Sequence, residues 1–194
     1  MSTPQRNPIE RRAVLGSIAV GAIGAIAGCL DESEDGTDDD SSDEPEPVSS
    51  DEDAAWQTTS LTDVRTDEEF TLGEFDHPLF LHTFSTGCAT CHSQHYEFEE
   101  FYERAEGDVE IVDVTTDVGA SPDDIRAYAE DDDYEWRFAI AEEEVIEGLV
   151  SDVGRDVTNS ARSPVVMICP DGESYRYEKR VDADEFESMI DDEC

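Results

Sequence analysis

Short apolar segments recur along the chain from about Trp56 onward, and four of them are predicted to be strands. Apolar residues dominate these four segments. A fifth, more polar segment is predicted to return beside the last of them as an edge strand. The predicted strands are residues 78–85, 109–114, 135–141, 164–169 and 174–180. Pro170-Asp171-Gly172 forms a turn between the last two strands, which are therefore predicted to be a hairpin.

Helical spacing appears between these strands. After Cys88, apolar positions recur every three or four residues and glutamates occupy the opposite face. Ser121 is a capping residue for a second helix, and residues 142–153 form a third that Gly154 ends. Asp182 caps a last helix at the end of the chain.

Strands that alternate with helices indicate an α/β domain. The order predicts a mostly parallel sheet covered by helices on both faces, closed by the hairpin and the last helix. Residues 56–194 are sufficient for one compact domain of ordinary size.

The charge of the chain changes the expected partners. It holds 52 acidic and 12 basic residues, for a net charge of -40. A polyanion gains no counterion release from phosphates, so nucleic acid is excluded as a partner. Such a surface is tolerable where molar salt shortens the Debye length to ~3 Å. The composition therefore resembles that of a halophile's protein.

The N-terminus has the features of an export signal. Arg11-Arg12 precede an uncharged run, residues 13–28, which is shorter than the ~20 residues of a membrane-spanning helix. The arginine pair resembles a twin-arginine leader and residues 26–29 resemble a lipobox, as in haloarchaeal lipoproteins. This resemblance implies cleavage after Gly28 and lipidation of Cys29, with Glu10 as a departure from the usual residue before the arginines. An uncleaved anchor is the alternative, and either form holds the protein on the outer face of the cell membrane.

Residues 29–55 form a predicted linker between the leader and the domain. Beyond Leu30 they are mainly Asp, Glu, Ser, Thr, Gly and Pro. So few apolar side chains cannot form a core, and the like charges keep the segment extended. The linker is expected to be disordered and to hold the domain away from the membrane.

Cys88 and Cys91 are the candidate reactive residues. They stand where a predicted strand ends and a helix begins, and free amide groups and the helix dipole stabilise a thiolate there. Two cysteines three positions apart in a first helical turn are within reach of a disulfide. The sequence therefore predicts thiol chemistry at this point.

The order of these elements resembles the thioredoxin fold, with the additional helix and strand of its TlpA and Sco branches. The resemblance covers residues 71–192 and includes the Cys-x-x-Cys position. It implies a central mixed sheet with helices on both faces. It also implies thiol–disulfide exchange with exported proteins that carry thiols or disulfides, without a cofactor.

Three site residues follow from this resemblance. Cys88 is expected to be the nucleophile, Cys91 the resolving thiol, and Pro164 the cis-proline that stands beside the dithiol and offers backbone to the substrate. The family often has Trp near the first cysteine, whereas this chain has Ser85-Thr86-Gly87. The reduction potential therefore does not transfer from the family.

Three other uses of the cysteine pair remain open. Cys88-x-x-Cys91-His92 is also the attachment pattern of c-type haem, for which Met167 or Met189 would have to be the axial ligand. A Sco-like copper(I) chaperone would use both thiolates with His92 or His95. The Sco pattern, however, has three residues between its cysteines and a distant histidine, which Thr158-Asn159-Ser160 replace here. The pair is also compatible with a structural disulfide in a binding module.

The remaining cysteines and histidines are expected to be structural. Cys169 ends a predicted core strand and Cys194 ends the chain, so the first is expected to be inert packing and the second a free thiol, with a disulfide between them as the alternative. His77 and His82 lie beside or within a strand, and the sequence indicates no partner for either.

Overall fold

The computed structural model describes residues 45–49, 54–178 and 180–194. The predicted leader, with Gly28 and Cys29, lies outside these residues, as does most of the predicted linker. Among the helices of the described part, none is both long and apolar enough to cross a membrane.

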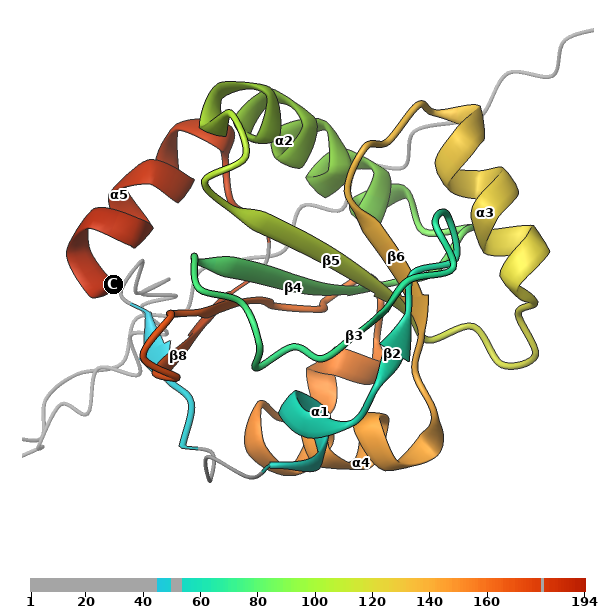
Figure 1. Ribbon diagram of the computed structural model, residues 1–194, viewed down its shortest axis with the longest axis horizontal. Coiled ribbons are helices and arrows are strands. Elements are labelled where there is room, and N and C mark those ends of the chain that lie inside the picture. The colour runs from blue at the N-terminus through green and yellow to red at the C-terminus, as the bar shows by residue number, and fades with distance from the viewer. Residues whose placement is uncertain (1–44, 50–53, 179) are drawn as a thin grey trace, which may run out of the picture. The chain divides into compact units, whose positions relative to one another are not determined.

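A six-stranded sheet forms the centre of the folded unit (Figure 1). In spatial order the strands are β1 (Glu46–Pro47), β8 (Ser174–Tyr177), β7 (Val165–Ile168), β4 (Leu79–Phe84), β5 (Glu110–Thr115) and β6 (Arg137–Ile140). The pairs β4–β5 and β5–β6 are parallel, whereas β1–β8, β8–β7 and β7–β4 are antiparallel. The predicted α/β class and mixed sheet are confirmed. The expectation of a mostly parallel sheet was wrong, because the final hairpin contributes antiparallel pairs.

Helices cover both faces of the sheet, as Figure 1 shows. One face carries α2 (Ala89–Ala105), α3 (Pro122–Asp131) and α5 (Ala183–Glu193), and the other carries α1 (Ala55–Thr58) and α4 (Glu143–Asp152). Side chains alternate along a strand, so β4 sends Phe80 and Phe84 into the first core and Leu79 and Leu81 into the second. His82 has the same parity as Phe80 and Phe84, and therefore faces α2.

The predicted helix ends are present. Ser121 Oγ accepts a hydrogen bond from the Asp124 amide at 3.2 Å, which satisfies one free amide of α3. Gly154 follows α4 with a φ of 117°, a conformation that side chains strongly disfavour. A short 3₁₀ helix, η1 (Arg155–Thr158), then leads toward β7.

A small N-terminal element was not predicted from the pattern. Besides α1, it contains an antiparallel pair, β2 (Leu61–Thr62) and β3 (Glu69–Phe70). Trp56 of α1 is fully buried, and its indole nitrogen donates to Asp152 at 2.9 Å. Gly148 permits this packing, because a Cβ there would lie 3.3 Å from Trp56 atoms.

The predicted linker also contributes to the sheet. In β1, Glu46 pairs with Arg176 and Pro47 pairs with Tyr175 of β8. Proline is tolerated in an edge strand of this kind, since no neighbour needs its missing amide. The described part of the linker therefore adds one short strand to the sheet edge.

Candidate functional site

The end of β4 and the start of α2 position the cysteine pair. The chain leaves β4 at Phe84 and turns, and the Cys88 amide donates to the Ser85 carbonyl at 3.1 Å. Cys88 is the N-cap of α2, and its sulfur accepts from the Cys91 amide at 3.2 Å. Cys88 and Cys91 form a disulfide with a Cα–Cα distance of 5.3 Å. The strand, turn and helix start predicted from the sequence are therefore all present.

The two sulfur-bearing residues differ in exposure. Cys88 is 9% exposed, whereas Cys91 is 0% exposed. Cys91 Sγ lies 3.3 Å from the Ser160 carbonyl oxygen, which can accept from the Cys91 thiol once the disulfide is reduced. A partner protein can therefore reach Cys88 more easily than Cys91, which is completely buried.

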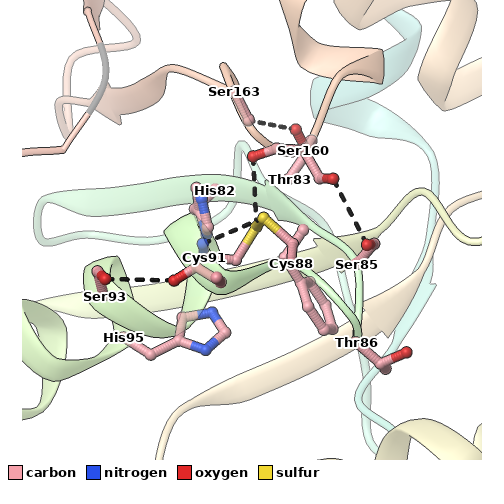
Figure 2. The surroundings of a disulfide bond; sticks show 12 residues. His82, Thr83, Ser85, Thr86, Cys88, Cys91, Ser93, His95, Ser160 and Ser163 are labelled. Atoms are coloured by element: carbon pink, nitrogen blue, oxygen red, sulfur yellow. Dashed lines mark hydrogen bonds between the residues drawn. A yellow bond between two sulfur atoms is a disulfide. The ribbon is translucent and has the colours of Figure 1, made fainter. Parts of the chain in front are cut away.

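A loop between η1 and β7 crosses the dithiol on one side, and His95 lies on the other side (Figure 2). Thr83 Oγ1 donates to the Val157 carbonyl at 2.6 Å and lies 2.5 Å from Ser163 Oγ. Ser160 Oγ is 3.4 Å from Ser85 Oγ. Because Thr83 is buried in β4, these bonds fix the loop relative to the strand that carries the cysteines.

Pro164 lies at the end of this loop, buried at the start of β7. Its expected cis geometry is not observed, since no peptide bond among the described residues is cis. The expectation of a cis bond at Pro164 was therefore wrong in this structure. Even before proline, the trans form is favoured by about 0.5–1 kcal/mol, and the sequence alone does not specify the isomer.

Beneath the dithiol lies a buried cluster of three polar side chains, which we call the His–Asp–His cluster: His82, His95 and Asp113. His82 comes from β4, Asp113 from β5 and His95 from α2. His82 Nδ1 lies 2.7 Å from Asp113 Oδ1, and His95 Nε2 lies 3.1 Å from the same oxygen. All three side chains are almost completely removed from solvent. His82 therefore does have a partner, which the sequence pattern did not indicate.

Two aromatic residues hold the outer edges of the cluster. Trp136 Nε1 donates to Asp113 Oδ2 at 2.6 Å, and the Tyr128 hydroxyl is hydrogen-bonded to His95 Nδ1 at 3.2 Å. Burial would raise the pKa of Asp113, but His95 and His82 outweigh it and hold that pKa well below its usual range. Asp113 is therefore an ionised carboxylate inside the core. Burial raises the pKa of Tyr128, so its hydroxyl keeps its proton.

The histidines of the copper alternative occupy different surroundings. His95 lies within the core and faces Asp113, whereas His92 is about 40% exposed and faces Asp132 at 3.9 Å. The methionines of the haem alternative, Met167 and Met189, pack in the apolar core beside α5. His77 lies on the surface, 3.1 Å from Asp76.

Cys169 and Cys194 form a second disulfide, so the expectation that both are unpaired was wrong. Their Cα atoms are 5.4 Å apart and 25 positions separate them in sequence. Cys169 follows β7 at the end that pairs with Leu79, whereas the dithiol follows Phe84 at the other end of β4, so the two disulfides lie at opposite ends of the central strands. The α5 helix brings Cys194 back to this strand, a long-range contact that no local pattern reveals.

Comparison with known proteins identifies the fold. No family model matches the sequence, and no curated protein matches it either. A thiol:disulfide interchange protein of the thioredoxin family from Chlorobium tepidum TLS aligns with a TM-score of 0.58 over 76% of this chain and 95% of its own, at 14% identity. A DsbF homologue from Corynebacterium diphtheriae aligns with a TM-score of 0.55 over 76% and 87% of the two chains, at 16% identity.

This chain has a thioredoxin fold. BsSco, a member of the Sco family of cytochrome c oxidase assembly proteins, is also similar, with a TM-score of 0.55 over 76% of this chain and 94% of its own, at 14% identity. The predicted thioredoxin-like architecture is thus confirmed, including its likeness to Sco and thiol–disulfide oxidoreductase structures. Within this thioredoxin fold, the Cys88–Cys91 pair and the loop at residues 160–164 lie together at one end of the central strands β4 and β7.

Proposed function

We propose that the protein is an extracytoplasmic, membrane-anchored thiol–disulfide oxidoreductase that acts on exported proteins through Cys88 and Cys91. The observation that carries the proposal is the difference in exposure between the two cysteines at the start of α2. Cys88 is 9% exposed and Cys91 is 0% exposed, and this order matches the roles of an attacking and a resolving thiol.

The exchange has two steps. The Cys88 thiolate attacks one sulfur of a partner disulfide, a mixed disulfide forms, and the other partner sulfur leaves as a thiolate. Cys91 then loses its proton and attacks Cys88 Sγ, which releases the second partner thiolate. The partner gains two electrons and the Cys88–Cys91 disulfide is restored. The reverse sequence oxidises a partner dithiol.

The local structure supports the first step. The Cys88 sulfur accepts the Cys91 amide at 3.2 Å, an interaction that stabilises a negative charge on sulfur. The α2 dipole adds to this stabilisation at its N-terminus. Both effects favour the thiolate, the form of cysteine that attacks disulfides.

The test is the reduction potential of the pair in purified protein at molar salt, together with trapping of a mixed disulfide. Cys91→Ser should accumulate a mixed disulfide with a model protein that contains a disulfide, and Cys88→Ser should not. A Cys169→Ser/Cys194→Ser variant is the matched control and should exchange like the parent. A potential between roughly -120 and -270 mV supports exchange, whereas a value below about -300 mV would indicate a structural disulfide.

The copper alternative is decided by a Cu(I) titration of the same reduced protein. Tight stoichiometric binding that His92→Gln weakens would favour a copper chaperone over an exchange catalyst. Among the described residues, one group of three side chains is placed to bind a metal ion, the His–Asp–His cluster. It contains neither Cys88 nor Cys91. This placement favours exchange as the function of the dithiol.

The membrane anchor is proposed from the leader. Cleavage after Gly28 would leave Cys29 as the lipidated N-terminus, and the acidic linker would follow it. Cys29→Ser should release the protein from the membrane fraction without changing exchange by the purified protein. Retention of this variant in the membrane would instead indicate an uncleaved anchor.

A further inference from the structure

The His–Asp–His cluster is the largest polar feature of the core that thiol exchange does not require. His82 and Asp113 occupy paired positions in the parallel strands β4 and β5, and His95 reaches them from α2. Both imidazole rings face the same carboxylate oxygen, Asp113 Oδ1, at 2.7 and 3.1 Å. One nitrogen from each ring and one carboxylate oxygen all lie within 4.8 Å of one another.

The charge of this cluster requires a positive partner. Asp113 is 0% exposed, and an isolated carboxylate is very unfavourable in such surroundings. Within residues 45–49, 54–178 and 180–194, its ion-pair partners are the two histidines, which are uncharged unless protonated. The counter-charge is therefore either a proton on a ring or a bound cation.

One ring nitrogen points to a cation. His95 Nε2 is completely buried and makes no hydrogen bond within the described chain, although Asp113 Oδ1 is only 3.1 Å away. The carboxylate oxygen lies near this nitrogen, but the two atoms do not form a hydrogen bond. A metal ion bound by the lone pair of His95 Nε2 would remain close to the carboxylate.

In two of these side chains, His95 and Asp113, the second polar atom is held by a hydrogen bond to a neighbour, as is common for residues that bind metals. Tyr128 holds His95 Nδ1, and Trp136 holds Asp113 Oδ2, which leaves His95 Nε2 and Asp113 Oδ1 facing the centre of the cluster. Ligating histidines almost always bond through their second nitrogen to a neighbouring polar group, which fixes the ring orientation. The structure contains this outer support before any ion is added.

We propose that His82 Nδ1, His95 Nε2 and Asp113 Oδ1 bind one divalent transition-metal ion of the zinc type. Two imidazoles and a carboxylate are a donor set that zinc accepts. With metal–ligand bonds of 2.0–2.2 Å, tetrahedral ligand atoms stand about 3.4 Å apart. The observed separations of 2.7 and 3.1 Å would therefore have to widen by about 0.7 and 0.3 Å to reach this value.

The bound ion would join β4, β5 and α2 directly beneath the dithiol. It would replace a histidine proton as the counter-charge of Asp113 and so stabilise the folded protein. Because the cluster is buried, metal exchange requires local opening and should be slow in the folded state. The site does not depend on the cysteines, and its failure would leave the proposed exchange function untouched.

The test uses the purified full-length protein with both disulfides intact and with the remaining cysteine removed by Cys29→Ser, so that no thiolate can bind the probe. The protein is unfolded with chelator and refolded with Zn²⁺ or Co²⁺, in molar KCl with millimolar Mg²⁺ to occupy the acidic surface. One Zn²⁺ per chain should remain after desalting. The Co²⁺ form should show visible d–d bands without thiolate charge-transfer absorption. A metal content no higher than that of Asp113→Asn protein, refolded in parallel, would overturn the proposal.

Single-residue variants distinguish metal binding at the His–Asp–His cluster from metal binding at the protein surface. Asp113→Asn and His82→Gln should weaken binding by roughly 100-fold or more, since each removes a ligand. His92→Gln and His77→Gln are matched controls outside the cluster and should bind within about 2-fold of the parent. Loss of metal in the two control variants, with full retention in Asp113→Asn, would contradict the assignment.

A measurement on the parent protein covers the case in which the ligand variants do not fold. Zinc should shift the ring-nitrogen NMR signals of His82 and His95 and leave those of His77 and His92 unchanged. Unchanged signals from His82 and His95 in zinc-loaded protein would overturn the proposal, whatever the variants do.

Discussion

His82 and Asp113 lie at paired positions of the parallel strands β4 and β5, and their side chains meet at 2.7 Å inside the core. A shift of β4 by one residue relative to β5 would turn the side chains of β4 to the opposite face of the sheet. His82 would then lose Asp113 and lie in the apolar core beneath α1 and α4. The His82–Asp113 pair therefore favours the observed register of β4 and β5 over registers shifted by one residue.

Asp113→Ala is predicted to destabilise the metal-free protein strongly. The substitution leaves His82, His95 and the Trp136 indole nitrogen buried without their common acceptor, and loss of one member of a buried ionic group costs about 3–5 kcal/mol. Denaturant unfolding at molar salt, with chelator present, measures the change. Asp132→Ala alters an exposed partner of His92 and is the control, with an expected change below about 0.5 kcal/mol. Equal unfolding midpoints for the two variants would contradict this role of Asp113.

The sequence was sufficient to predict the elements around the dithiol because their signals are local. The apolar run of β4, the cysteine spacing and the helical period after Cys88 each occupy a few neighbouring residues. The α/β class and the position of Cys88 at the start of α2 could therefore be predicted before the structure was known, whereas the mixed sheet was implied only by the resemblance to the thioredoxin fold.

Other features depend on contacts between distant residues. Asp113 is 31 positions from His82, and only the register of β4 on β5 brings them together. One signal was available, since each is a polar residue inside an apolar strand. Cys169 and Cys194 meet only after α5 has packed, and the isomer at Pro164 depends on the loop around it. None of these contacts leaves a periodic trace in the sequence.

Reduced Cys88 is predicted to react faster with an alkylating reagent in molar salt than in dilute buffer. The net charge of -40 disfavours a further negative charge on the sulfur at low ionic strength and so opposes the α2 dipole. At 1 M salt the Debye length falls to ~3 Å, which screens distant carboxylates more than the adjacent helix end. Stopped-flow alkylation of Cys91→Ser protein would measure this dependence, with circular dichroism to confirm that the fold is intact. A rate that falls with salt in folded protein would contradict it.

Removing the second disulfide is predicted to lower stability without changing exchange. Cys169 and Cys194 close a loop with a sequence separation of 25, for which the chain-entropy model gives about 3.5 kcal/mol. The expected result for Cys169→Ser/Cys194→Ser is a lower unfolding midpoint, first seen as loss of α5. The reduction potential of Cys88–Cys91 should remain that of the parent, because the two disulfides lie at opposite ends of the central strands. A changed potential with unchanged stability would show that the two sites are coupled.

Thr83→Val is predicted to slow exchange by loosening the loop that faces Cys91. The substitution keeps the shape of the side chain but removes the hydroxyl that donates to the Val157 carbonyl and contacts Ser163. An unsatisfied buried carbonyl costs about 1–3 kcal/mol, and the loop that supplies the Ser160 carbonyl to Cys91 loses its tie to β4. The expected result is a severalfold lower kcat/KM with a smaller change in reduction potential. Ser93→Ala is the matched control. It removes the exposed hydrogen bond from the Ser93 hydroxyl to the Ala89 carbonyl in α2, and its exchange rate should be close to that of the parent. If Thr83→Val exchanged as fast as Ser93→Ala despite a measurable loss of stability, the loop would support the fold but would not help to position Cys91.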